Sequence, residues 1–181
     1  MRGKLSKSQL LRRDYAVEVE SVKYLIDLNR DGTREKIVLI KRDGLDFFMI
    51  KDAFGRVILE EKLRAKGGES RIYKIDFRTL STQTDVMILY FYEGLLSAVN
   101  FEAAARIYMV TIDKRDLGSL SMTEGPHYFH EFQMVKNKYG RRSHRVDLSD
   151  LNKDGVKEVL VRYSGTQSVW MYQGKGNWKQ I

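Results

Sequence analysis

The stretch DLNRDGTREKIVL, residues 27–39, places oxygen-bearing side chains at alternate positions and then passes into an apolar run. It returns later in the chain as DLNKDGVKEVLV, residues 150–161. In each copy a glycine follows the third acceptor, and a glutamate precedes a run of aliphatic residues. Such runs are typical of buried strands. The two copies therefore predict a repeated unit in which an acidic loop leads into a strand.

Three segments share this order of features and define units at about 21–64, 70–112 and 143–181. Each unit continues from the loop, or a relic of it, through KIVLIKRDG, VMILYFYEG or VLVRYSG into two further apolar runs. Apolar runs separated by short turn-like stretches predict four-stranded antiparallel meanders. The chain is therefore expected to be all-β, with three to four blade-like four-stranded antiparallel sheets in a small or incomplete propeller-like ring.

Two parts of the chain fall outside the repeat. Residues 1–14 are polar and basic and are expected to form a flexible tail, which leaves 15–181 as a single repeat domain. The insert, 113–142, is expected to hold either a degenerate extra sheet or a short helix near 128–138. A ring would close if the insert, or AVEVESV at residues 16–22, supplied further strands. An open curved stack and closure by dimerisation are the alternatives, so the oligomeric state is left open.

The acidic loop has the pattern of a cation site. Ca²⁺ takes six to eight hard oxygen ligands, and in an EF-hand loop positions 1, 3 and 5 point inward, position 7 offers its carbonyl and position 6 is glycine. In this chain the glycines are Gly32 and Gly155. The expected ligands are Asp27, Asn29, Asp31 and the Thr33 carbonyl in one copy, and Asp150, Asn152, Asp154 and the Val156 carbonyl in the other.

The loop is not a complete EF-hand. Position 12, which carries a bidentate glutamate in an EF-hand, is Val38 in the first copy and Val161 in the second. The next acid stands instead at position 9, as Glu35 and Glu158, and the residues after it predict a strand where an EF-hand has a helix.

The pattern Asp-x-Asn-x-Asp-Gly-x-x-Glu followed by an apolar strand resembles the FG-GAP or VCBS repeat of integrin-alpha-type β-propellers. The resemblance implies that each loop joins two strands of one blade and binds calcium through positions 1, 3, 5, 7 and 9. It therefore adds Glu35 and Glu158 to the two ligand sets. Lys36, Lys153 and Lys157 lie near the loops in the sequence and reduce the local negative charge, so weak sites of the extracellular kind are expected, with a Kd on the order of 10⁻⁴–10⁻³ M.

The second unit keeps only the outer acids of the loop. In DFRTLSTQTD, Asp76 and Asp85 remain, but arginine, leucine and serine replace the middle acceptors. A cation would lose most of its charged ligands at this place. The loop is expected to be metal-free and held by the hydroxyl groups of Thr79, Ser81, Thr82 and Thr84.

Composition limits the partners. The formal net charge of the 181-residue chain is +8, which attracts nucleic acid, anionic lipid or an anionic polymer such as cell wall or polysaccharide. General solubility is the alternative role of this charge, and a protein partner is also left open. Nucleic acid is disfavoured because no recognition motif accompanies the basic residues, which include Lys136, Lys138 and Arg141. The absence of cysteine excludes disulfides and thiolate sites.

The apolar runs are too short to span a membrane, so no membrane span is expected. The basic start lacks the apolar core of a signal peptide. A periplasmic or extracellular location is nevertheless expected, with a cytoplasmic one as the alternative.

Catalytic motifs are not evident. The sequence has no nucleophile elbow, P-loop or dinucleotide pattern. His127 and His130 would share a face on a helix and face opposite sides of a strand. Zinc is disfavoured because His144 is the only other histidine and the chain has no cysteine. Trp170 and Trp178 are expected in the core, with a sugar platform as the alternative. The expected function is a non-enzymatic, calcium-binding scaffold module of an exported bacterial protein. The alternatives are a carbohydrate-active or hydrolytic enzyme on a propeller scaffold and a basic nucleic-acid-binding module.

Overall fold

The computed structural model describes residues 19–65, 70–95, 102–134, 138–163 and 166–181. The predicted tail, 1–14, lies outside these ranges, as does Lys136. Within them the chain forms β-strands and one short 3-10 helix, η1 (Leu117–Ser119), and no α-helix. No helix of the described residues is long and apolar enough to cross a membrane. The prediction of an all-β chain is confirmed.

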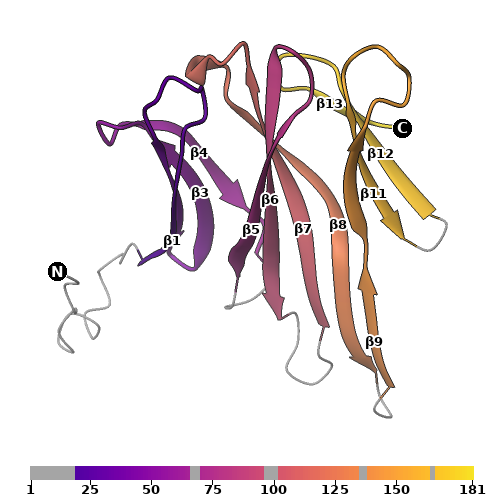
Figure 1. Cartoon of the computed structure of the whole chain (residues 1–181). Helices are drawn as coiled ribbons and strands as arrows, with labels where there is room; N and C mark the ends of the chain where they lie inside the picture. The colour runs from indigo at the N-terminus through magenta and orange to yellow at the C-terminus, as the bar shows by residue number, and fades with distance from the viewer. Residues whose placement is uncertain (1–18, 66–69, 96–101, 135–137, 164–165) are drawn as a thin grey trace, which may run out of the picture.

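The strands form three antiparallel sheets in chain order, coloured from indigo to yellow in Figure 1. The first sheet contains β1 (Val19–Ile26), β2 (Glu35–Arg42), β3 (Leu45–Lys51) and β4 (Val57–Leu63). The middle sheet contains β5 (Arg71–Thr79), β6 (Thr84–Leu95), β7 (Glu102–Asp113), β8 (Ser121–Met134) and β9 (Lys138–Ser143). The third sheet contains β10 (Arg145–Ser149), β11 (Glu158–Tyr163), β12 (Thr166–Tyr172) and β13 (Trp178–Gln180).

The first and third sheets match the predicted four-stranded meanders, whereas the middle sheet has five strands. Both expectations for the insert, 113–142, are wrong in its described part: β8 covers residues 128–134 of the region proposed as a helix, and β8 and β9 join the middle sheet rather than a separate one. Long apolar strands explain this result. Strands β6 and β7 have 12 residues each, and a β8 strand of 14 residues can pair along most of β7.

Residues 19–22, the described part of the segment AVEVESV, do not complete a distant sheet. Val19, Glu20 and Val22 pair with Lys41, Ile40 and Leu39 of β2, with a bulge between Glu20 and Val22. Strand β1 therefore begins within this segment and belongs to the first sheet. The closure route through residues 19–22 is wrong, because local antiparallel pairing across one loop already uses their backbone groups.

The middle sheet is buried on both faces. Alternate residues of β6, beginning with Met87, lie in a first core shared with the first sheet. The intervening residues, beginning with Val86, lie in a second core shared with the third sheet. Since side chains of a strand alternate between faces, the unbroken apolar run VMILYFY serves two cores at once. The three sheets are thus layers stacked face to face.

The stacking brings the acidic loops to one end of the molecule. The turns β1–β2, β5–β6 and β10–β11 all lie along the upper edge in Figure 1. Two contacts tie them together: Arg30 Nη2 lies 2.9 Å from Asp85 Oδ1, and the Lys157 amide donates to the Leu80 carbonyl over 3.0 Å. The repeat therefore positions equivalent turns of three sheets side by side.

Candidate functional site

The two acidic loops, defined as the first loop (27–35) and the second loop (150–158), have the same backbone conformation. Their fourth residues, Arg30 and Lys153, have φ of 62° and 63°, and the glycines Gly32 and Gly155 have φ of 87° and 86°. Glycine is required at the sixth position because a side chain is strained at such φ. Two distant stretches of similar sequence therefore fold alike, which indicates that local sequence determines the loop.

Asp27 opens the first loop and accepts backbone hydrogen bonds. Its Oδ1 accepts from the Asp31 amide over 3.1 Å, and its Oδ2 accepts from the Gly32 amide over 2.9 Å. In the second loop, Asp150 Oδ2 accepts from the Gly155 amide over 3.0 Å. The first acid of each loop thus holds the glycine turn closed across the loop.

The third and fifth residues interact directly in both loops. Asn29 Nδ2 donates to Asp31 Oδ2 over 2.8 Å, and Asn152 Nδ2 donates to Asp154 Oδ2 over the same distance. Asp31 Oδ1 also accepts from the Thr33 amide over 2.6 Å. The hydrogen bond from Asn29, followed by that from the Thr33 amide, holds the pKa of Asp31 below its ordinary value. Both bonds favour the ionised carboxylate.

The acid at position 9 is buried in both loops. Glu35 is 1% exposed and Glu158 is 3% exposed. Glu35 Oε2 accepts from the Leu28 amide over 2.8 Å, and Glu158 Oε2 accepts from the Leu151 amide over 2.7 Å. This acid therefore ties the start of its loop to the first residue of the following strand, independently of any ligand.

One atom distinguishes the loops. Asp150 Oδ1 is buried and has no hydrogen-bond partner, whereas both carboxylate oxygens of Asp27 accept amide hydrogens. A buried, unpartnered carboxylate oxygen carries a free-energy cost of about 1–3 kcal/mol, which a bound cation would relieve. The orphaned oxygen therefore marks the second loop as the better candidate for a cation.

The donor sets of the loops suit calcium in chemical type. All the predicted side-chain ligands are carboxylate or amide oxygens, and the Thr33 and Val156 carbonyls would be backbone oxygens of the same chemical type. Within the described ranges, however, no three His, Cys, Asp or Glu side chains are close enough to hold a metal ion between them. The reason is that each carboxylate is directed toward a backbone amide. A carboxylate oxygen that accepts one hydrogen bond keeps a second lone pair for a ligand.

The middle hairpin, residues 79–85, is shorter than the predicted loop. Asp76 lies within β5 opposite Ile88, and Thr79 pairs with Asp85. Of the four hydroxyl residues expected to hold the loop, Ser81 does so, because its Oγ accepts from the amides of Gln83 and Thr84. The hairpin is therefore closed mainly by strand pairing, and Asp76 is not at its tip.

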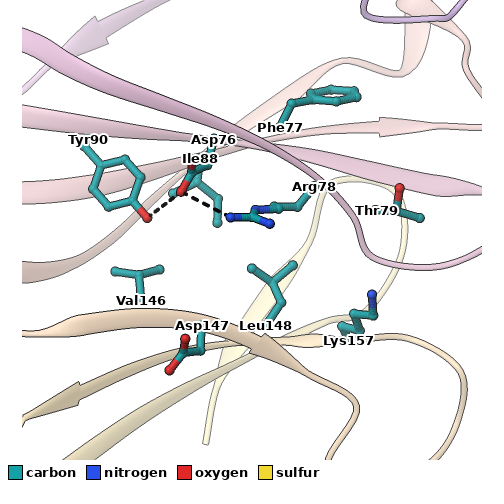
Figure 2. A pocket seen from close by; sticks show the side chains of 10 residues that line it. All are labelled: Asp76, Phe77, Arg78, Thr79, Ile88, Tyr90, Val146, Asp147, Leu148 and Lys157. Atoms are coloured by element: carbon teal, nitrogen blue, oxygen red, sulfur yellow. Dashed lines mark hydrogen bonds and ion pairs between the residues drawn. The ribbon is translucent and has the colours of Figure 1, made fainter.

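A cleft of about 420 Å³ separates β5 and β6 from β10 (Figure 2). Asp76 is its central acid: Oδ2 accepts from the Tyr90 hydroxyl over 3.1 Å and lies 2.7 Å from Lys74 Nζ. Arg78 Nη2 lies 4.0 Å from the same oxygen. Burial, and then the charge of Asp76, raises the pKa of Tyr90. The charges at the centre of this cleft are therefore already paired within the protein.

His127 and His130 lie on the same side of β8, although residues three apart on a regular strand would face opposite sides. Their ring centroids are 5.0 Å apart with an interplanar angle of 89°. Ala105 pairs with Phe129 and Arg106 pairs with His127, so Tyr128 is an extra residue in the ladder. A β-bulge of this kind shifts the alternation of side chains by one residue. The periodicity of the sequence does not reveal such a bulge.

The same bulge builds a buried charged network that the sequence did not indicate. Glu93 is fully buried, and its Oε1 accepts from Arg106 Nε and lies 3.1 Å from His127 Nε2. Arg106 also pairs with Glu124, whose second oxygen lies 3.1 Å from Arg64 Nε. Burial raises the pKa of Glu93, but the bonds from His127 and Arg106 outweigh it, so the pKa lies below its ordinary value. The network links β6, β7 and β8.

The aromatic residues of the third sheet pack on the second core. Trp170, Tyr172 and Trp178 are half-buried against it, and the rings of Tyr172 and Trp178 lie 5.2 Å apart. The Tyr172 hydroxyl donates to Asp113 Oδ2 over 2.6 Å. This packing supports the core interpretation over a sugar platform.

Comparison with protein-family models, curated proteins and solved structures finds no match to this chain.

Proposed function

We propose that the protein is a non-enzymatic binding module built from propeller-type blades, in which the first and second loops bind calcium. The face-to-face stacking of three meander sheets, with equivalent turns at one end, supports the blade interpretation (Figure 1). Propeller blades are four-stranded antiparallel sheets that pack through their faces, and the first and third sheets have this number of strands while the middle sheet has a fifth.

The calcium ligands would come from positions 1, 3, 5, 7 and 9 of each loop. Calcium supplies a positive charge that neutralises the carboxylates and fixes the loop between two strands. The carboxylates of the first and fifth residues already hold each loop closed in the absence of calcium, because they accept hydrogen bonds from backbone amides. The proposed ligands are Asp27, Asn29, Asp31, Thr33 and Glu35, and Asp150, Asn152, Asp154, Val156 and Glu158.

The observation that carries the proposal is the buried Asp150 Oδ1, which has no hydrogen-bond partner. Asp150 Oδ2, Asn152 Oδ1 and Asp154 Oδ1 of the same loop each accept from a backbone amide. An Asx turn made only to reverse the chain needs no such atom, since its side chain bonds its own backbone. An unpaired acceptor beside further carboxylates is what a cation would use.

The chemistry of the loops also suggests where the module works. Sites with a Kd on the order of 10⁻⁴–10⁻³ M fill where calcium is millimolar, as it is outside cells. The basic side chains near the loops, such as Lys153 and Lys157, would lower the affinity into this range. We therefore place the module in a periplasmic or extracellular setting, with a protein or an anionic polymer as its partner.

Isothermal titration calorimetry with CaCl₂ after treatment with a chelator tests the proposal. Binding with a Kd near the millimolar range is expected for the wild type and is expected to disappear in the Asp31→Ala, Asp154→Ala double variant. Glu61→Ala, Asp116→Ala is a matched control with the same change in charge away from the two loops. If the wild type neither binds calcium nor melts at a different temperature in calcium and in chelator, the loops are turns only.

A further inference from the structure

A cavity of about 460 Å³ lies between the first loop, the middle hairpin and the turn that follows β7. Three cations line it: Arg30 from the first loop, and Lys114 and Arg115 from the turn. Asp85 is the single carboxylate in the lining. Positive charge thus converges on one hollow from two elements that lie far apart in the sequence.

Two of the three cations have no ion-pair partner among the described residues, and the third, Arg30, is only partly used by its pair with Asp85. Arg30 Nη2 contacts Asp85 Oδ1 at 2.9 Å and Thr79 Oγ1 at 3.3 Å, while its Nε and Nη1 make no hydrogen bond to the described residues. Lys114 and Arg115 make no ion pair within the same ranges. The carboxylate of Asp113, next to them, is occupied by the hydroxyls of Thr84 at 2.8 Å and Tyr172 at 2.6 Å.

The turn that presents Lys114 and Arg115 is strained. Their φ angles are 52° and 58°, and the Asp116 amide donates to the Asp113 carbonyl over 2.9 Å, as in a type I′ turn. Asn-Gly is the usual choice for such a turn, because long side chains disfavour positive φ. The Lys114 amide also donates to the Gln83 carbonyl over 2.6 Å, which holds the turn against the hairpin. Lys114 and Arg115 therefore stand at two positions where the conformation of the turn favours asparagine and glycine.

The hairpin wall adds hydroxyl donors. Thr79 Oγ1 accepts from Arg30, and Ser81 Oγ accepts from the amides of Gln83 and Thr84. Because each oxygen is used as an acceptor, its own hydrogen is left to donate, and neither finds an acceptor among the described residues. Donors of this kind suit an anionic ligand, since phosphate and sulfate oxygens only accept when fully ionised.

We propose that this cavity binds a phosphate or sulfate group carried on a molecule about the size of a monosaccharide. The two turn cations and the free face of Arg30 would contact the oxyanion. A volume near 460 Å³ lies within the range of small-molecule sites and exceeds what a bare oxyanion fills. The inference deepens the proposed binding function by naming a ligand class, but it does not require calcium.

Amide NMR titrations test it, with inorganic phosphate, glucose 6-phosphate and glucose as probes, each in calcium and in chelator. We expect glucose 6-phosphate to bind more tightly than phosphate, and glucose not to bind. Shifts should centre on residues 79–85 and 113–116. Binding that persists in chelator when calcium binding fails separates this site from the proposed loop function.

The Lys114→Asn, Arg115→Gly variant removes both cations and supplies the favoured turn sequence. It should weaken glucose 6-phosphate binding by about tenfold or more while leaving the melting temperature unchanged or higher. The matched control is Lys153→Asn, Lys175→Asn, which removes two exposed cations that also have positive φ but lie outside the cavity. If the control variant weakens glucose 6-phosphate binding equally, the ligand is attracted by the net charge of the protein and not by the cavity. That result, or the absence of shifts with millimolar phosphate and glucose 6-phosphate, overturns the proposal.

Discussion

The first and second loops share a backbone and a set of hydrogen bonds but differ in what surrounds them. Leu28, the second residue of the first loop, is fully buried in the first core, whereas its counterpart Leu151 is 46% exposed. Arg30 of the first loop pairs with Asp85, whereas Lys153 at the same position forms no ion pair among the described residues. The comparison shows that local sequence determines the form of the loop, while the neighbouring sheet determines its environment.

The physical reason is the position of each loop in the stack. The first loop packs over the middle sheet, which contributes Met87 and Leu89 to the core around Leu28. The second loop contacts the middle hairpin through the Lys157 amide and directs Leu151 toward solvent. The same loop therefore contributes differently to stability in the two places.

The largest expected difference between the loops concerns these leucines. Leu28→Ala should lower the free energy of unfolding by about 2–5 kcal/mol, because it leaves a cavity in a packed core. Leu151→Ala should change it by no more than about 0.5 kcal/mol. Urea denaturation of the two variants, followed by circular dichroism, measures both values. Equal losses would contradict the assignment of the two loops to different environments.

A smaller effect concerns calcium. Asp27 uses both carboxylate oxygens for amides, whereas Asp150 keeps Oδ1 unpaired, so the second loop should bind calcium more tightly. A site at a calcium concentration tenfold above its Kd adds about 1.4 kcal/mol to the free energy of unfolding. At subsaturating calcium, Asp150→Ala should therefore remove a larger share of the calcium-induced stabilisation than Asp27→Ala.

Thermal melts of both variants at stepped calcium concentrations, each compared with a melt in chelator, measure this share. A larger loss in Asp27→Ala would mean that the unpaired oxygen does not mark the stronger site.

Features that depend on short stretches could be predicted from the sequence. The glycine turns at Gly32 and Gly155 and the strands that begin at Glu35 and Glu158 are found where the pattern of acceptors and aliphatic residues places them. Each depends on contacts within about ten residues, which the local sequence contains. The calcium ligand sets and the membership of a propeller family stay predictions.

Features that depend on pairing between distant strands could not be predicted. The insert joins the middle sheet because β8 pairs with β7. The periodicity of the insert predicts strands at most, and it does not indicate whether they join an existing sheet or form a new one. Tyr128 has no partner in the register between β7 and β8, and this extra residue brings His127 and His130 to one side of the strand. The alternation of residue types in the sequence does not reveal it. The cavity cations also meet only through the stacking of sheets. The one feature of the sequence that pointed to this cavity is the pair of long cationic side chains, Lys114 and Arg115, at turn positions.

A still smaller effect concerns Arg30. Arg30→Asn should lower the free energy of unfolding by about 1 kcal/mol or less, because the side chain of Asp85 is only 9% exposed while that of Arg30 is 44% exposed and screened by solvent. Lys153→Asn should be nearly neutral, since asparagine tolerates the left-handed conformation of both positions. Chemical denaturation in low and high salt checks the difference, which should narrow as salt rises. A difference that is independent of salt would contradict an ionic origin.

The smallest expected effect is a pKa in the first loop. Asn29→Ala removes the hydrogen bond that contributes most to the lowered pKa of Asp31, so this pKa should rise toward its ordinary value. A pKa that is lower in the folded state adds stability above the unfolded pKa of about 4, and this stability is lost as pH falls through the folded pKa. The part of the stability difference that comes from this pKa should thus be present at neutral pH and absent in strong acid, whereas the loss of the bond from the Asp31 amide to Asn29 Oδ1 acts at every pH. Carboxyl NMR titration measures the pKa directly. Because Asp31 is ionised at neutral pH in both proteins, a lower calcium affinity of the variant there must come from the lost Asn29 ligand or from a displaced Asp31 carboxylate, and not from the charge of Asp31.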